Sequence, residues 1–261
     1  MIDIHTHLLP GVDDGSPNAG HSALIMNRMR EEGVRAIVCT PHLNASAAKS
    51  APFDEHARLL VELQAQAPSD LTLYHGFEIM LDTDTVHLAD ARLGLAGSRA
   101  RLVEFPRRGL PADATAQLAR LRAQGLMPVV AHPERYAGCD TATIATWREL
   151  GAVIQCDAMA LLARGPMADF ALEMLGAGQV DILASDNHGD RRSLATAALW
   201  MTEIGAGTQA SILTAANPQL LLAEQPLQPV PPVSFHRGVF DRLRELIFRS
   251  PLQARARDLP Q

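Results

Sequence analysis

Two histidines near the start of the chain could share one metal ion. His5 and His7 stand two residues apart, at the end of an alternating segment, 2–5, that predicts a short strand. Side chains with this spacing project to the same side of a strand, so both imidazoles can reach one cation. A lone His-x-His pair is weak evidence, because such histidines are more often ordinary surface or hydrogen-bonded residues. A metal site therefore requires further ligands from later strands.

Ligand-type residues recur where nearly every later strand is predicted to end. Taken singly, each is explained as a helix cap, a turn residue or a surface acid. Together they place imidazoles and carboxylates, which bind zinc, manganese or iron, at equivalent points of the fold. Carboxylates gathered there without cations would repel one another. The sequence therefore predicts a site for more than one metal ion, and the residues at these positions are Asp13, Asp14, His42, Glu78, Glu104, His132, Gln155, Asp157, Asp186 and His188.

Arginines follow two of these histidines. Arg135 comes three residues after one of them, and Arg191 and Arg192 come three and four residues after another. Guanidinium groups beside a metal cluster suit the non-bridging oxygens of a phosphate, through bidentate hydrogen bonds. The alternative is a salt bridge to a neighbouring acid, Glu134 or Asp190. We favour phosphate for Arg135 and Arg191, and the salt bridge for Arg192.

Short apolar runs alternate with amphipathic helical patterns along most of the chain. Near-continuously apolar strands are typical of a parallel sheet covered by helices. Seven β-α repeats predict an α/β barrel with one unit fewer than the usual eight, although a doubly wound sheet shows the same alternation. In such barrels the active site lies at the carboxyl ends of the strands, where the candidate ligands stand. The strand-like runs are 2–5, 34–39, 71–75, 101–105, 127–131, 152–156 and 180–184, and the helical patterns are 19–32, 53–67, 112–124, 141–150, 167–176 and 194–204.

The composition narrows the class of protein. A chain of 261 residues with 47% hydrophobic content suits one large α/β domain. A net charge of −6 argues against nucleic acid as a partner. Three scattered cysteines suit a reducing compartment, and none is followed six positions later by the arginine of a cysteine-nucleophile phosphatase. Neither a signal peptide nor an apolar run of membrane-spanning length is found, so we expect a cytoplasmic protein.

The end of the chain has a different character. Residues 225–233 are rich in proline and predict a semi-rigid spacer, and 235–249 shows a helical pattern with one apolar face. We therefore expect a barrel domain at 1–224, followed by a proline-rich linker and a C-terminal helix and tail at 225–261. Docking of this helix on the barrel is favoured over docking to a partner or to a membrane surface.

Several segments of the chain resemble the PHP (polymerase and histidinol phosphatase) superfamily of metal-dependent phosphoesterases. The resemblance is greatest to the bacterial tyrosine-protein phosphatases encoded with capsule and exopolysaccharide genes. It covers residues 1 to about 222, in order and at family-like spacing. The segments that carry it are Met1–His7, Val12–Gly15, Thr40–His42, Gly76–Ile79, Val103–Phe105, Ala131–Tyr136, Ala184–His188 and Asn217–Pro218.

This resemblance implies a distorted seven-stranded barrel that holds three divalent metal ions, manganese in the first place, with iron or zinc as alternatives. Arg135 and Arg191 would hold the phosphate. The segment after His188 departs from the family pattern, since it is short and lacks the expected prolines, which leaves the choice between Arg191 and Arg192 open. The metal ligands implied are His5, His7, Asp14, His42, Glu78, Glu104, His132, Asp186 and His188.

The activity implied is hydrolysis of a phosphotyrosine ester by metal-bound hydroxide. The substrate would be the phosphorylated tail of a membrane-associated bacterial tyrosine kinase that controls capsular or exopolysaccharide synthesis. A small-molecule phosphomonoesterase of the histidinol phosphatase type would use the same site. An amidohydrolase-type metal hydrolase ranks lower, because Glu104 stands where many of those enzymes have a lysine and the only lysine is Lys49. A non-catalytic, metal-stabilised scaffold that binds a kinase ranks lower too, because the ligand set is full and arginines stand beside it.

Overall fold

The strands form two parallel sheets. The computed structural model describes residues 1–83, 87–106 and 109–234. Within these ranges one sheet has the strand order β1-β2-β4 and the other the order β3-β5-β6-β7-β8-β9. The α/β class is therefore confirmed. The strands are β1 (Ile2–Thr6), β2 (Ala36–Cys39), β3 (His42–Asn44), β4 (Thr72–His75), β5 (Glu78–Met80), β6 (Ala100–Glu104), β7 (Met127–Ala131), β8 (Val153–Asp157) and β9 (Ile182–Ala184).

All seven predicted strand runs form strands, and two further short strands, β3 and β5, were not predicted. β3 follows β2 after Thr40 and Pro41, and β5 follows β4 after Gly76 and Phe77. The two short strands begin with His42 and Glu78, which face each other in the β3–β5 pairing. These breaks in the strands therefore deliver two candidate ligands side by side.

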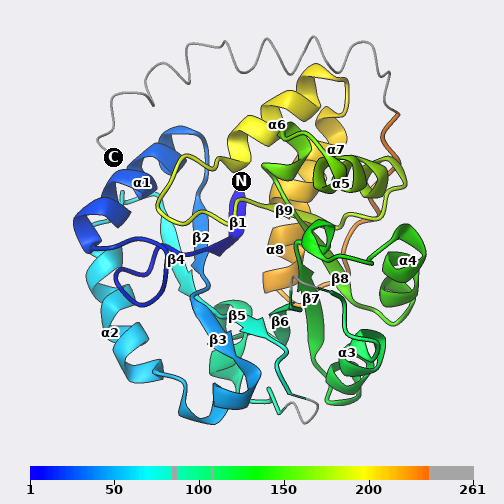
Figure 1. The fold of residues 1–261 in the computed structure, drawn as a ribbon. Coiled ribbons are helices and arrows are strands. Elements are labelled where there is room, and N and C mark those ends of the chain that lie inside the picture. The colour runs from blue at the N-terminus through cyan, green and yellow to red at the C-terminus, as the bar shows by residue number, and fades with distance from the viewer. Residues whose placement is uncertain (84–86, 107–108, 235–261) are drawn as a thin grey trace.

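Helices α1 to α6 lie around the outside of the strands, whereas α8 lies among them in this view (Figure 1). Side-chain caps begin three of them: Asn18, Asp140 and Ser193 each accept a backbone N–H from the first turn. The six predicted helical patterns all form helices, whose ends differ from those expected by up to three residues. The elements are α1 (Ala19–Glu31), α2 (Phe53–Gln64), α3 (Ala114–Ala123), α4 (Thr141–Glu149), α5 (Pro166–Gly176), α6 (Leu194–Glu203), α7 (Gly207–Ser211), the π-helix η6 (Ile212–Ala216), α8 (Asn217–Leu222), and the 3₁₀ turns η1 (Ala45–Ser50), η2 (Ala91–Leu93), η3 (Leu95–Gly97), η4 (Pro133–Arg135) and η5 (Ala160–Leu162).

The first and last strands lie beside each other. The backbone N–H of Asp186 donates to the carbonyl of His5 at 3.0 Å, and that of His7 donates to the carbonyl of Asn187 at 2.7 Å. One apolar cluster also joins Ile4 of β1 with residues of β2, β6, β7, β8 and β9 and with α8. The two sheets therefore share a core, and residues from both ends of the domain meet near the carboxyl end of β1.

The proline-rich segment packs against this core. Val230 and Val233 are buried, and the side chain of Asn217 accepts from the backbone N–H of Gln228 and donates to its carbonyl. The segment predicted as a spacer therefore lies on the domain as far as residue 234. The predicted helix at 235–249 falls outside the described residues. Among those described, no helix is both long and apolar enough to cross a membrane.

Candidate metal centre

Four ligand-type side chains converge at the carboxyl end of β1. The Nε2 atoms of His5 and His7 are 3.2 Å apart, and each lies 3.2 Å from Oδ1 of Asp186. Oε2 of Glu78 lies 3.3 and 3.4 Å from the same two nitrogens. All four side chains are buried. Two imidazoles and two carboxylates that aim their ligand atoms at one point are a suitable donor set for a divalent cation.

A second group extends from His7 toward the surface. It adds Asp14, His42 and His188. Oδ1 of Asp14 lies 3.3 Å from Nε2 of His42 and 3.4 Å from Nε2 of His188. The side chain of Asp14 is 71% exposed, so this group stands at the mouth of the site.

A third group lies on the other side of His42. Its Nδ1 is 3.0 Å from Oε2 of Glu78 and 3.7 Å from Oε1 of Glu104. His132 belongs here as well, because its Nε2 is 2.7 Å from Glu78 and 3.9 Å from Glu104. Glu78 therefore touches the first and third groups, and all nine predicted ligands lie in one continuous cluster.

Two of these candidate ligands have a left-handed backbone conformation, which among the described residues other than glycine is also found at Ala96 and Glu224. His132 has a φ of +34° and Asp186 a φ of +49°. Residues other than glycine adopt this left-handed region at a cost, and such positions gather at functional sites. At His132 it turns the chain sharply from β7 into η4, which brings both His132 and Arg135 to the cluster.

Residues around the cluster fix the histidine tautomers. Nδ1 of His7 donates to Oδ2 of Asp13 at 2.7 Å, and Nδ1 of His5 donates to Oε1 of Gln155 at 3.0 Å. Nδ1 of His188 donates to the carbonyl of Asp186 at 2.9 Å. In the neutral ring each of these bonds places the proton on Nδ1, which leaves Nε2 free and directed into the cluster, as a metal ligand requires. Asp13 and Gln155 thus orient ligands, a role that their position in the sequence did not indicate.

The histidines and carboxylates of the cluster shift one another's pKa values. Burial disfavours the charged imidazole of His5, but the carboxylates of Glu78 and Asp186 outweigh it and raise the pKa of His5 to about 9. Burial would raise the pKa of Glu78, yet the surrounding histidines hold it well below its usual value. Oε2 of Glu78 and Oδ1 of Asp186 are buried without a hydrogen bond. Buried anionic oxygens that lack donors fit bound cations.

The three candidate arginines differ in their surroundings. Nη2 of Arg135 donates to Asp157 and to Oδ2 of Asp186, so this arginine lies in the cluster without pairing with Glu134. Nη1 of Arg192 lies 2.9 Å from the same Asp186 oxygen, while its Nε pairs with Asp190 at 2.9 Å. Arg191 is exposed. The salt bridge expected for Arg192 is present, and its guanidinium also reaches the cluster.

Two histidines that lie outside the cluster pair with each other. Nδ1 of His56 lies 3.1 Å from Nε2 of His75, and both rings pack against Phe77. Another, His21, has Nε2 2.5 Å from the carbonyl of Gly189 in the loop after β9. These contacts give all three histidines structural roles outside the cluster.

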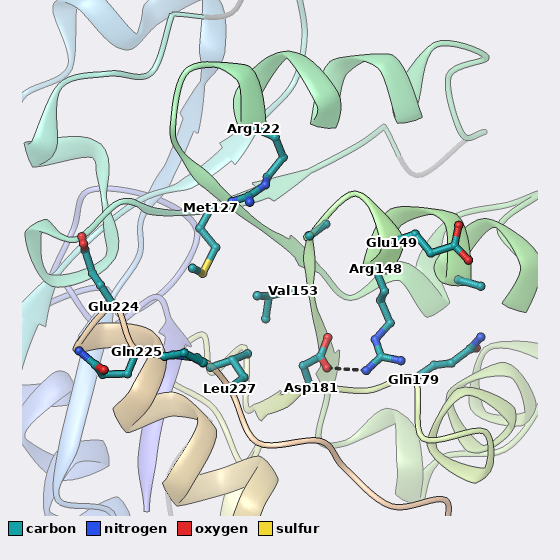
Figure 2. A pocket seen from close by; sticks show the side chains of 14 residues that line it. Arg122, Met127, Arg148, Glu149, Val153, Gln179, Asp181, Glu224, Gln225 and Leu227 are labelled. Carbon is teal, nitrogen blue, oxygen red and sulfur yellow. Dashed lines mark hydrogen bonds and ion pairs between the residues drawn. The ribbon is translucent and has the colours of Figure 1, made fainter.

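A cleft of about 700 Å³ lies at the opposite end of the strands (Figure 2). It is lined by Met127 and Val153, which begin β7 and β8, and by Asp181, which precedes β9. Arg148 donates to Asp181 across it at 2.9 Å. The metal-type residues lie at the carboxyl ends of the strands, so this cleft is separate from them.

The parallel α/β fold, the ligands at its strand ends and the adjoining arginines together define a metal-dependent hydrolase. The chain belongs to the CpsB/CapC family of capsular polysaccharide synthesis, whose model matches residues 1–223.

The relatives of the chain are named as phosphatases. It is 29% identical over 242 residues to tyrosine-protein phosphatase YwqE of Bacillus subtilis, over 89% of this chain and 95% of that protein. It is also 30% identical over 141 residues to tyrosine-protein phosphatase CpsB of Streptococcus pneumoniae, and this match covers 52% of this chain and 58% of that protein. A crystal structure from work on YwqE and CpsB, described there as unique metal-dependent tyrosine phosphatases, is similar to this chain. The match has a TM-score of 0.73 and 28% sequence identity, and it covers 90% of this chain and 100% of that one.

Proposed function

We propose that this protein is a metal-dependent phosphatase that hydrolyses phosphotyrosine. The observation that carries the proposal is the convergence of His5, His7, Glu78 and Asp186 on one point, with Arg135 bonded to the same aspartate. Membership of the CpsB/CapC family and the names of the relatives support it. Bound divalent cations would acidify a water molecule and neutralise phosphate charge.

The residues present fit three cations, because the ligands fall into three overlapping groups. We infer manganese, with iron or zinc as alternatives, since imidazole and carboxylate donors suit all three metals. The proposed ligands are His5, His7, Asp14, His42, Glu78, Glu104, His132, Asp186 and His188.

The arginines would bind the phosphate and stabilise charge on its equatorial oxygens. Arg135 already lies at the cluster, held by two carboxylates. For the second arginine we keep Arg191 as the prediction and set Arg192 beside it, because Arg192 contacts Asp186. A tyrosine leaving group, with a pKa of about 10, needs little help from a general acid.

The natural substrate we propose is the phosphotyrosine-containing tail of a membrane-associated bacterial tyrosine kinase. We place the reaction in the cytoplasm. The family description, capsular polysaccharide synthesis, supports this assignment. The net charge of −6 supports a partner other than nucleic acid.

We also infer that the two sheets form one distorted barrel with seven strand positions, within a domain of residues 1–224 followed by the segment 225–261. The backbone N–H of Gly76 donates to the carbonyl of Cys39 at 2.9 Å, and that of Glu78 to Pro41 at 3.1 Å, so bonding continues across both strand breaks. Each of the pairs β2–β3 and β4–β5 would then fill one position.

An assay of metal-loaded protein against a phosphotyrosine peptide, p-nitrophenyl phosphate and histidinol phosphate tests the proposal. We expect hydrolysis of the first two and little of the third. Preference for histidinol phosphate would favour the small-molecule phosphomonoesterase. No hydrolysis of any of them, with manganese, iron or zinc supplied, would refute the phosphatase assignment.

Variants separate the roles of the residues. Arg135→Ala should keep its metal content and lose turnover, whereas His5→Ala should lose both, because only the histidine is a proposed ligand. Arg191→Ala and Arg192→Ala, measured side by side, identify the second phosphate-binding arginine by the larger rise in KM.

A further inference from the structure

Arg135 is held between two carboxylates that have different neighbours. Its Nη2 donates to Oδ2 of Asp186 at 2.6 Å and also to Oδ2 of Asp157. Asp186 belongs to the ligand groups, but Asp157 belongs to none of those found among the described residues. The role of Asp157 is therefore unexplained by metal binding.

Asp157 is itself rigidly placed. It ends β8, and it is only 5% exposed. Its Oδ1 accepts the backbone N–H of Met159 at 2.8 Å, which leaves Oδ2 for Arg135. The backbone N–H of Asp157 donates to Oε1 of Glu134 at 2.8 Å. Glu134 directly precedes Arg135 in η4. One short turn therefore supplies the arginine and also binds the backbone of Asp157.

We propose that Asp157 is a positioning residue, which fixes the guanidinium of Arg135 so that its remaining N–H groups face the phosphate. This inference rests on the proposed function of the site. Asp186 would divide its charge between a cation and Arg135, because its Oδ1 faces the histidines and its Oδ2 faces the arginine. Asp157 is then the carboxylate devoted to Arg135.

A different role for Asp157 would be proton donation to the tyrosine leaving group. The geometry disfavours it, because both carboxylate oxygens of Asp157 are engaged and its side chain is 7% exposed. The two roles make different kinetic predictions. A proton donor matters more as the leaving group becomes more basic, whereas a positioning residue affects all phosphate esters alike.

The test is a double-variant cycle on the metal-loaded full chain, with Asp157→Asn, Arg135→Ala and both together. The amide oxygen of asparagine can still accept the Met159 N–H, so the turn is kept. The NH₂ group that replaces Oδ2 has no lone pair to accept a hydrogen bond from the Arg135 guanidinium. We expect Asp157→Asn to lower kcat/KM about 10- to 100-fold, equally for phosphotyrosine peptide and p-nitrophenyl phosphate. The inhibition constant of inorganic phosphate should rise as well, with metal content unchanged.

In the Arg135→Ala background, the Asp157 change should have no further effect, because its partner is gone. Asp169→Asn, an exposed aspartate in the first turn of α5, is the matched control and should behave as wild type. The positioning role is wrong if the losses of kcat/KM in the two single variants multiply in the double variant. It is also wrong if Asp157→Asn lowers kcat/KM more for the phosphotyrosine peptide than for p-nitrophenyl phosphate. A fully active Asp157→Asn also overturns it, whereas a wild-type protein inactive on both esters overturns the phosphatase assignment instead.

Discussion

Nη1 of Arg28 lies 2.8 Å from the carbonyl oxygen of Asp190, which joins helix α1 to the loop that follows β9. Nη2 of the same arginine donates to the carbonyl of Arg192 at 3.1 Å. Beside it, Ser193 donates to Glu32 of the C-cap of α1 at 2.8 Å. One helix thus fixes the loop that carries His188 and the two candidate phosphate-binding arginines.

Replacing Arg28 with alanine should free this loop without removing any proposed ligand. We expect KM for a phosphotyrosine peptide to rise about tenfold, because a small misplacement of a binding group is costly. Arg58→Ala, on the exposed face of α2, is the control and should leave KM unchanged. Steady-state kinetics at fixed metal concentration measure both. An unchanged KM in Arg28→Ala would show that the loop holds its shape alone.

Gln155→Leu should weaken metal binding, although Gln155 is not a proposed ligand. It removes the acceptor that fixes the ring of His5, and partners of this kind contribute about 10- to 100-fold to metal affinity. Titration of the metal-free protein by calorimetry or by competition with a chelating dye gives the affinity. The exposed Gln66→Leu serves as control. Equal affinities in the two variants would contradict an orienting role.

Removal of metal should destabilise the folded protein. Ions that bind only the native state at about 100 times their dissociation constant contribute about 2.7 kcal/mol, so a chelator should lower the melting temperature by several degrees. Glu78→Gln, which alters a ligand shared by two of the groups, should melt lower and respond less to the chelator. Differential scanning calorimetry makes the comparison. An identical melting temperature with and without chelator would argue against bound metal.

The pair formed by His56 and His75 should make stability depend on pH away from the metal centre. Burial, with the neighbouring His56, lowers the pKa of His75 from 6.5 to about 4. The folded state therefore binds fewer protons than the unfolded state, so the free energy of unfolding falls as pH drops from about 6.5 toward 4. At pH 5.5 the lowered pKa of His75 alone reduces the free energy of unfolding by about 1 kcal/mol relative to neutral pH.

Urea unfolding of wild type and His75→Gln at pH 7.5 and 5.5 isolates this effect. The variant should lose about 1 kcal/mol less on acidification, because it has no imidazole to protonate at this position. His87→Gln, at an exposed position, should follow wild type. Parallel losses in all three proteins would assign the pH dependence to other groups.

The sequence was most informative where chemistry and strand periodicity coincide. All nine proposed ligands were predicted because each lies at or after the predicted end of a strand, and the structure brings them into one cluster. β3 and β5 escaped prediction because three residues are too few to show a period. Contacts such as Arg28 with Asp190, 162 residues apart, have no local signal. Asp157 was predicted to lie at a strand end with the other candidates, but only the folded chain shows that it accepts a hydrogen bond from Arg135.

The pairing of β1 with the segment after β9 has a consequence for synthesis of the protein on the ribosome. His5 emerges long before Asp186 and His188, which appear only after most of the domain has been made. A partial chain therefore presents a few separate histidines and acids, with no assembled pocket. On the proposed assignment, tight binding of cations requires the last strand, so an unfinished chain would lack phosphatase activity.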